Sequence, residues 1–165
     1  LHFHVQRDDQ APLAEALFAG RLQMGETVSV RGPVGDFVLD ADSSRPLLFA
    51  ACDTGFGPVK SLIEHAIASE QVESFALYWL AGTPDGHYLA NQCRAWQAAF
   101  DRFSYVPLVD ADPVGGATRL VESMRGGGIV GSDVFVAGPA AFVEAVVPRL
   151  IDAGADRDRM RALVT

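Results

Sequence analysis

Two loops rich in glycine and proline could present bare backbone to a ligand. The first, Asp53-Thr54-Gly55-Phe56-Gly57-Pro58, follows a continuous apolar run and precedes a stretch with helical spacing. Free N–H groups at the start of a helix and the helix dipole both favour negative charge, and proline suits the first helical turn. Thr54 and Gly55 are therefore candidates for contact with an anion such as a phosphate group. The alternative is an ordinary strand-to-helix turn, because short glycine motifs have low specificity.

The second loop is Ala137-Gly138-Pro139, which also follows an apolar run and precedes a helical stripe. Gly138 and Pro139 leave the backbone bare, so that a flat ring could approach it, and a tight turn is the alternative. Ligands of open parallel sheets bind beyond the carboxyl ends of the strands. If both loops end strands of one sheet they flank a single crevice, so the pair is more informative than either loop alone.

The elements that must position these loops follow from hydrophobic patterning. Continuous apolar runs predict strands buried on both faces at 47–51 and 75–80, and two further strands are predicted at 103–108 and 134–137. Apolar residues at helical spacing predict helices within 59–67, 89–100, 118–124 and 142–151. Alternating strands and helices indicate βαβ units. The predicted fold class is α/β, a Rossmann-like parallel sheet with helices on both faces.

The first forty residues have a different pattern. Alternation of apolar and polar residues predicts short strands at 1–5 and 27–30, and the apolar segment 37–39 after a turn predicts a further strand. Pro12 suits the first turn of a short helix over 12–18. The segment Gly32-Pro33-Val34-Gly35-Asp36-Phe37 is typical of a β-turn with an aromatic core anchor, and the polar stretch 42–46 is the candidate linker to the region that follows.

Composition narrows the classes of partner. The chain has 165 residues, of which 49% are hydrophobic, and a net charge of −8. An acidic surface argues against nucleic acid and anionic membranes as partners, and no apolar run reaches the roughly 20 residues of a membrane span. Cys52 and Cys93 lack CxxC spacing, which argues against structural zinc and a disulfide framework, so a reducing, cytoplasmic location is the simplest interpretation. Because the chain does not begin with Met, we expect it to be part of a longer protein.

Other residues with chemical potential have a simpler structural interpretation. His2 and His4 would share one strand face and could chelate a metal, but no third ligand is in view and a polar strand face is favoured. Cys52 could be a reactive thiol near a helix N-terminus, although a small buried side chain is favoured. No catalytic residue and no metal ligand is assigned from the sequence.

In this order and spacing, the segments resemble the ferredoxin–NADP reductase superfamily, in particular the reductase components of oxygenases and the CDP-6-deoxy-glucoseen reductase-like proteins. The stretch 31–37 is similar to the family's GPxGxF segment, 54–61 to its TGxxPxxS loop, and 136–139 to its CGPP segment. The resemblance implies that residues 1–42 are the C-terminal part of an antiparallel, flavin-binding β-barrel domain. Residues 43–165 would then form the NAD(P)-binding domain.

The resemblance also implies a function, that of an NAD(P)H-dependent flavoprotein oxidoreductase. Electrons would pass from NADH through FAD to an iron–sulfur protein or domain, such as that of an oxygenase partner. The implied cofactor-binding residues lie in the three glycine-containing segments and in the loop after the second apolar run. They are Thr54, Gly55, Pro58, Gly138, Pro139, Asp85, Gly32 and Gly35.

The sequence also departs from the family pattern. Asp53 stands where glycine is expected, Gly82 where arginine is common, and Ala137 where cysteine is expected. The family's RxYS flavin-binding segment is absent. Asp85 favours NADH over NADPH, because a carboxylate suits a free ribose whereas a 2′-phosphate needs an arginine; a solvated turn residue is the alternative. The departures favour a second hypothesis, a degenerate, non-catalytic nucleotide-binding or interaction domain that retains the reductase fold.

Overall fold

The computed structural model describes residues 2–7, 10–32, 34–69 and 73–165. It divides the chain into two compact units, residues 1–36 and residues 37–165. The second unit contains the candidate loops at 53–58 and 137–139. The assignment of residues 1–42 to a flavin-binding domain stays a prediction.

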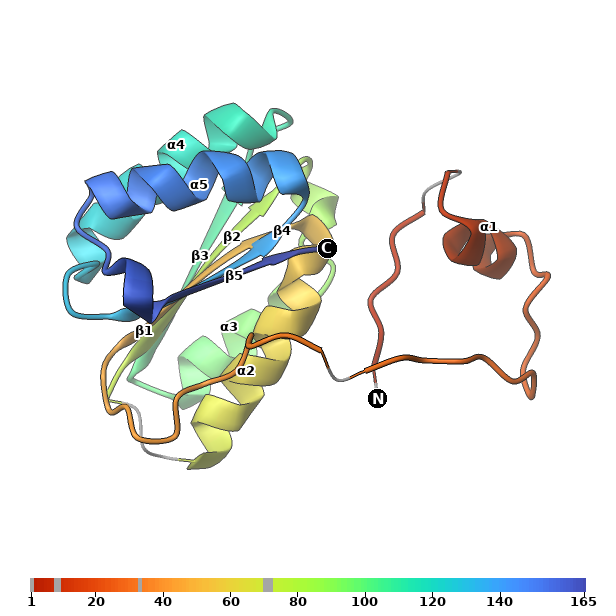
Figure 1. Ribbon diagram of the computed structural model, residues 1–165, viewed down its shortest axis with the longest axis horizontal. Coiled ribbons are helices and arrows are strands. Elements are labelled where there is room, and N and C mark those ends of the chain that lie inside the picture. Colours follow the sequence, from red (N-terminus) through yellow and green to blue (C-terminus); the bar gives the residue numbers. More distant parts are fainter. Residues whose placement is uncertain (1, 8–9, 33, 70–72) are drawn as a thin grey trace. The chain divides into compact units, whose positions relative to one another are not determined.

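The larger unit is built on one parallel sheet of five strands (Figure 1). Every neighbouring pair of strands in it is parallel. The strands are β1 (Leu47–Cys52), β2 (Phe75–Ala81), β3 (Phe103–Val109), β4 (Asp133–Gly138) and β5 (Met160–Val164), and they lie in the order β3-β2-β1-β4-β5. The predicted α/β fold class is therefore confirmed, and the four strands predicted at 47–51, 75–80, 103–108 and 134–137 are β1 to β4.

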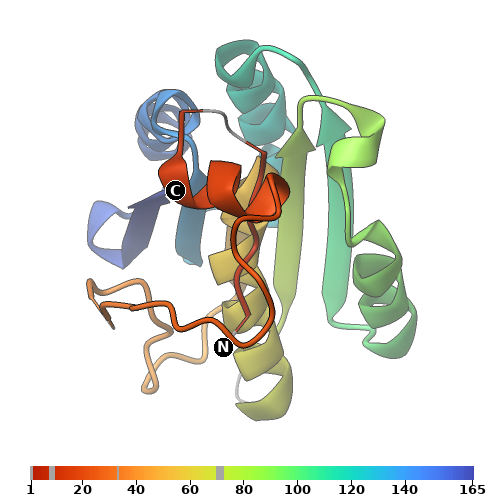
Figure 2. The same ribbon diagram turned by 90° about the vertical axis from the view of Figure 1, so that its right-hand side faces the viewer.

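Helices cover both faces of this sheet (Figures 1 and 2). On one face lie α2 (Phe56–Ser69) and α3 (Ala90–Ala99), and on the other lie α4 (Pro113–Met124) and α5 (Ala140–Asp152). Short 3-10 helices occupy the connections: η1 (Asp53–Gly55), η2 (Pro84–Gly86), η3 (Arg125–Gly127) and η4 (Arg157–Arg159). Each βαβ connection therefore places a helix start beside the carboxyl end of a strand.

The core explains why the central strands are continuous apolar runs. All residues of β1, β2 and β4 are buried, because side chains on both faces meet helices. Alternate residues serve the two faces: Phe49 and Trp79 contribute to the cluster under α2 and α3, and Leu48 and Val136 to the cluster under α4 and α5. The edge strand β3 alternates buried and exposed residues, and it tolerates Pro107 because only one of its sides is paired.

Helix α4 begins earlier than predicted. The side chain of Asp112 accepts hydrogen bonds from the backbone N–H groups of Val114 and Gly115, each at 3.0 Å, and Pro113 occupies the first helical turn. A Cβ atom at Gly116 would lie 2.6 Å from Leu80 Cδ2, so a glycine there lets α4 approach β2. The expected start near residue 118 was wrong because Gly115 and Gly116, which would weaken a helix in general, lie in its first turn. Here Gly115 donates to the capping Asp112 side chain and Gly116 allows close packing on Leu80.

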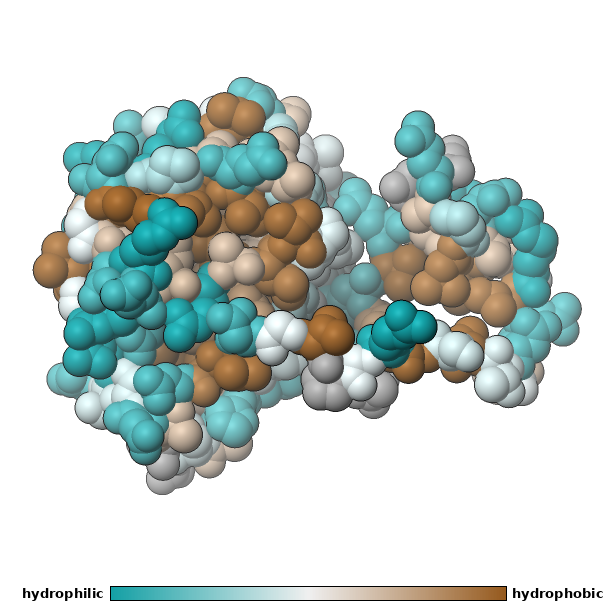
Figure 3. Space-filling model, viewed as in Figure 1, coloured by the Kyte–Doolittle hydropathy of each residue, from teal (hydrophilic) through white to brown (hydrophobic). Residues whose placement is uncertain are grey.

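The smaller unit contains helix α1 (Pro12–Phe18), as predicted. The strands predicted at 1–5, 27–30 and 37–39 are corrected: residues 2–5, 27–30 and 37–39 form no strand, and Leu1 lies outside the described residues. Alternation shows which side chains could share a face, but a strand also needs a neighbour to pair its N–H and C=O groups. Several apolar side chains of this unit are exposed, among them Phe3, Leu13, Phe18 and Val28, and apolar surface is visible on it in Figure 3.

Candidate functional site

The sheet has a topological switch point at β1. From β1 the chain moves outward to β2 and then β3, and it returns to the other side of β1 to form β4 and β5. Helix α2, after β1, lies on one face, whereas α5, after β4, lies on the other. The chain therefore leaves the adjacent strands β1 and β4 toward opposite faces of the sheet. In open α/β sheets this is where ligands bind.

Gly55 brings the two predicted loops into direct contact. A Cβ atom at this position would lie 2.2 Å from the carbonyl oxygen of Ala137 and 2.6 Å from the backbone nitrogen of Gly138. Only a residue without a side chain fits against the end of β4 at that distance. The expectation that the loops share one sheet edge is met by the geometry, because β1 and β4 are paired neighbours.

Gly138 has a packing role beside its predicted contact with a ring. A Cβ atom there would lie 2.8 Å from Cys52 Cβ and 2.9 Å from Phe142 Cδ1, so it would point into the interior. The carbonyl oxygen of Gly138 accepts a hydrogen bond from the N–H of Thr165 at 3.0 Å. Gly138 thus joins the carboxyl ends of β1, β4 and β5.

The remaining predicted residues are distributed over two regions. Thr54 lies in η1 and Pro58 in the first turn of α2, and both are half-buried, as is Pro139 before α5. Asp85 is exposed in η2, beyond the neighbouring strand β2. Gly32 and Gly35 are exposed and belong to the smaller unit. Their role as cofactor-binding residues stays a prediction.

Asp53 is a functional candidate that sequence reasoning noted only as a departure from the family. Its φ of +48° makes it the one non-glycine residue with positive φ in the described part of the chain. Its carboxylate accepts hydrogen bonds from Gly82 N–H (3.4 Å) and from the Cys52 thiol (3.7 Å). Its carbonyl oxygen accepts a third from Trp79 Nε1–H at 3.2 Å. The available signal was an aspartate at a glycine position, since aspartate tolerates left-handed backbone.

An aromatic cluster joins the start of α2 to the loop after β2. The rings of Phe56 and Trp79 stack with centroids 4.0 Å apart. The rings of His87 and Tyr88 lie edge-on to Trp79, at 5.1 and 5.2 Å, and a His87 ring nitrogen is 2.9 Å from the Trp79 carbonyl oxygen. Burial, and to a smaller extent the charges of Cys93 and Asp53, raise the pKa of Tyr88. The loop after β2 is therefore packed, through His87 and Tyr88, against Trp79 near the start of α2.

The two cysteines are buried, which confirms their interpretation as small interior side chains. Burial raises the pKa of the Cys52 thiol, and the adjacent Asp53 carboxylate raises it further. Burial likewise raises the pKa of Cys93 to about 12. Neither thiol is therefore a nucleophile near neutral pH. Among the residues that the structure describes, no group of three or more His, Cys, Asp or Glu side chains could hold a metal ion.

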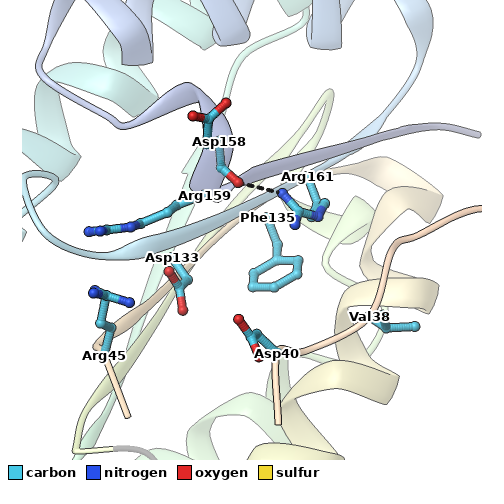
Figure 4. A pocket seen from close by; sticks show the side chains of 8 residues that line it. All are labelled: Val38, Asp40, Arg45, Asp133, Phe135, Asp158, Arg159 and Arg161. Carbon is cyan, nitrogen blue, oxygen red and sulfur yellow. Dashed lines mark hydrogen bonds between the residues drawn. The ribbon is translucent and has the colours of Figure 1, made fainter. Parts of the chain in front are cut away.

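A charged cavity lies at the opposite edge of the sheet, where β4 and β5 begin (Figure 4). It has a volume of about 100 Å³, and its charged lining residues are Asp40, Arg45, Asp133, Asp158, Arg159 and Arg161. Asp133 is buried and accepts a hydrogen bond from the Ser43 hydroxyl. The alternation of carboxylates and guanidinium groups leaves little net charge, and the strands' amino ends are not where such sheets bind ligands.

The sheet, its switch point and its loops define a ferredoxin–NADP reductase-like fold. A ferredoxin NADP+ reductase from Neisseria gonorrhoeae with bound FAD and NADP superposes with a TM-score of 0.73 over 94% of this chain and 71% of that chain, at 14% identity. The ferredoxin reductase of carbazole 1,9a-dioxygenase superposes with a TM-score of 0.72 over 96% of this chain and 49% of that chain, at 18% identity.

Two of the three sequence relatives described next are named as reductases. Reductase component 2 of terephthalate 1,2-dioxygenase from Comamonas sp is 28% identical over 140 residues, which are 81% of this chain and 42% of that protein. Protein RfbI of Salmonella typhimurium is 31% identical over 112 residues, 68% of this chain and 33% of RfbI. The CDP-6-deoxy-L-threo-D-glycero-4-hexulose-3-dehydrase reductase of Yersinia pestis is 29% identical over 113 residues, 68% of this chain and 33% of that protein.

These relatives confirm the resemblance inferred from the motifs. The homologues include oxygenase reductase components and a CDP-6-deoxy-hexulose dehydrase reductase, and the fold neighbours are ferredoxin–NADP reductase-like proteins. The chain spans between a third and a half of the length of the relatives named here. No protein-family model matches the chain. In the described residues, no helix has both the length and the apolar character that crossing a membrane requires.

Proposed function

We propose that this chain is the nucleotide-binding part of an NAD(P)H-dependent flavoprotein reductase that passes electrons from NADH through FAD to an iron–sulfur or oxygenase partner. The observation that supports the proposal most is the contact of Gly55 with Ala137 and Gly138 at the switch point. It places two backbone segments that carry no bulky side chain at the one edge where an open parallel sheet binds a dinucleotide.

The residues at this edge fit a nicotinamide dinucleotide. The first N–H groups of a helix have no intrahelical partner, so those at Thr54 and Gly55, at the start of η1 and α2, can bind the pyrophosphate. The backbone at Gly138 and Pro139 offers a flat surface to the nicotinamide. The bound NADH and FAD would supply the redox chemistry, and the protein would orient them and limit access of water.

A preference for NADH over NADPH belongs to the same proposal. The stretch from Gly82 to Leu89 contains no lysine or arginine. Asp85 is the exposed carboxylate of this loop, and a carboxylate can accept hydrogen bonds from the hydroxyls of a free ribose but repels a 2′-phosphate. Asp85→Asn removes the repulsion and should tighten NADPH binding by about threefold, whereas Asp85→Arg also adds a cation and should tighten it by about tenfold. Unchanged NADPH binding in both variants would mark Asp85 as a solvated turn residue.

Flavin binding requires more than the residues described in the smaller unit. Residues 2–7, 10–32 and 34–36 contain one short helix and no strand, so they do not form a closed barrel by themselves. The longer relatives support the proposal that FAD is held by a longer protein, to which residues 1–42, with Gly32 and Gly35, contribute the end of the barrel. A cytoplasmic location is part of the proposal, supported by two buried cysteines without a disulfide.

The test compares two proteins, the 165-residue chain and a longer form extended upstream of Leu1. Isothermal titration with NADH measures binding to the chain, and absorbance near the flavin bands measures bound FAD in the longer form. We expect NADH to bind the chain and to bleach the flavin of the longer form under anaerobic conditions. A longer form with neither bound flavin nor NADH-dependent bleaching would favour the degenerate, non-catalytic module instead.

A further inference from the structure

The backbone of Asp53 has a conformation that most residues avoid. A φ of +48° lies in the left-handed region, which glycine adopts freely and which asparagine and aspartate tolerate better than other residues. The residues that follow turn at once into the right-handed helices η1 and α2. Backbone that changes from left- to right-handed can turn successive N–H groups toward one concave surface, an arrangement that suits anions. The backbone conformation of Asp53 thus sets the direction in which the chain enters η1 and α2.

Three hydrogen bonds stabilise this conformation, and two of them come from β2 and the loop after it. Trp79 Nε1–H donates to the Asp53 carbonyl oxygen at 3.2 Å, and Gly82 N–H donates to Asp53 Oδ1 at 3.4 Å. The Cys52 thiol donates to Oδ2 at 3.7 Å. The carboxylate therefore contacts the end of β1 and the first residue after β2.

The Gly82 contact has a consequence for the rest of the loop. Gly82 is the first residue after β2, and the stretch that follows ends at Tyr88 and Leu89, which pack beside Trp79 and Phe56. Asp53 thus attaches the near end of the loop, and the aromatic cluster attaches the far end. Asp85, the residue assigned to the ribose, lies between these two attachments.

We propose that Asp53 is a positioning residue: its carboxylate ties the nucleotide loop Gly82–Leu89 to the start of α2, and its negative charge beside the helix start weakens the binding of the dinucleotide pyrophosphate. The first part concerns the protein alone. The second rests on the proposed function, since it requires that the dinucleotide occupies this edge.

The test uses two variants that both lack the negative charge of Asp53 and therefore differ only in the side chain that remains. Asp53→Asn keeps an oxygen for the Gly82 N–H and a residue that tolerates positive φ, but it removes the negative charge. Asp53→Gly also tolerates positive φ and removes the charge, but it leaves Gly82 without its acceptor. Hydrogen exchange of the Gly82 amide, followed by NMR on the 165-residue chain, measures the attachment; isothermal titration with NADH at low and high salt measures affinity.

We expect Gly82 exchange to be nearly unchanged in Asp53→Asn and at least tenfold faster in Asp53→Gly. Asp53→Asn should bind NADH about three- to tenfold more tightly than the wild type at low salt, with the gain shrinking at high salt because exposed charges are screened. Asp53→Gly should bind more weakly than Asp53→Asn by a similar factor. Equal Gly82 exchange in both variants would overturn the positioning role.

The outcomes separate this inference from the proposed function. If the wild type binds NADH and Asp53→Asn binds it no better, the charge effect is refuted while the nucleotide site stands. If neither the wild type nor either variant binds NADH, the proposed function and the charge effect both fail, and Gly82 exchange still decides the positioning role. A salt-independent gain in Asp53→Asn would also contradict the charge effect, because a purely structural change would not depend on ionic strength.

Discussion

The two ends of the parallel strands, here called the carboxyl edge and the amino edge of the sheet, have different kinds of groups for binding a ligand. At the carboxyl edge, the contacts that define the candidate site are made by backbone: Gly55 lies against Ala137 and Gly138 with no space for a side chain. At the amino edge, a cavity is lined by arginine and aspartate side chains, and its arginines would suggest an anion site by composition (Figure 4). Topology nevertheless favours the first edge for the proposed dinucleotide site, because helix starts and a switch point coincide there.

Charge balance argues against a phosphate site among the arginines of the amino edge. The carboxylates of Asp40, Asp133 and Asp158 line the same cavity as the arginines. Arg159 is paired with Asp156 at 3.4 Å, and Arg161 donates to the Asp158 carbonyl oxygen at 2.8 Å. Arginines engaged in this way have less of their positive field available for a ligand. The comparison favours helix starts and bare backbone over a local count of arginines as the basis for proposing a nucleotide site in this fold.

The largest effect should come from a side chain at the contact between the two loops. Gly55→Val would place Cβ 2.2 Å from the Ala137 carbonyl oxygen, and only a shift of the backbone could relieve this overlap. We therefore expect the free energy of unfolding to fall by about 3 kcal/mol and NADH binding to be lost. Thermal unfolding and isothermal titration measure the two effects. Gly126→Ala is the control, because a Cβ atom there meets nothing within 4 Å. A Gly55→Val protein as stable as the wild type would show that the loops do not touch.

Gly138→Ala should have the second largest effect. The added methyl group would lie 2.8 Å from Cys52 Cβ and 2.9 Å from the Phe142 ring, and Phe142 can shift slightly, so we expect a loss of about 1–3 kcal/mol. Denaturant unfolding measures it. Gly82→Ala, with open space around its Cβ atom, is the comparison at the end of β2. A lower NADH affinity of Gly138→Ala with unchanged stability would instead favour a role in covering the nicotinamide alone.

The sequence predicted the central sheet because burial on both faces leaves an unambiguous pattern. The runs that became β1, β2 and β4 are apolar at every position that both helical layers cover. The strand β5 was missed, because it is a half-exposed edge strand of five residues that includes Arg161, and such a segment has no continuous apolar run. The early strands were wrong for the converse reason: alternation was present, but the described residues supply no pairing neighbour.

The candidate site was predictable in position but not in its contacts. Strand-to-helix loops with glycine located Thr54, Gly55 and Pro139 at one edge, because parallel strands end together. That Gly55 contacts the end of β4, or that Asp53 turns its carboxylate to Gly82, depends on which strands are neighbours and on backbone angles. A single sequence does not specify strand order, so these contacts needed the three-dimensional structure.

At the amino edge, a moderate effect is expected from the buried carboxylate. The Ser43 hydroxyl donates to Asp133, whose side chain is buried, so Ser43→Ala would leave a buried charge with one donor fewer. We expect a loss of about 1–2 kcal/mol in unfolding free energy, as for hydrogen bonds to charged groups. Ser44→Ala, the exposed neighbour, is the control. NADH affinity should stay the same in both variants, and a weaker affinity in Ser43→Ala would connect the two edges.

The smallest effect should come from the arginines themselves. A double variant, Arg45→Ala with Arg159→Ala, removes two cations from the amino-edge cavity. Because Arg45 is exposed and the Arg159–Asp156 pair is largely solvated, we expect a stability change within about 0.5 kcal/mol. NADH affinity, measured at low salt where electrostatic effects are largest, should change less than twofold. A tenfold loss of affinity would place the phosphate groups at the amino edge, because removing exposed cations remote from the site cannot have an effect of that size through the fold.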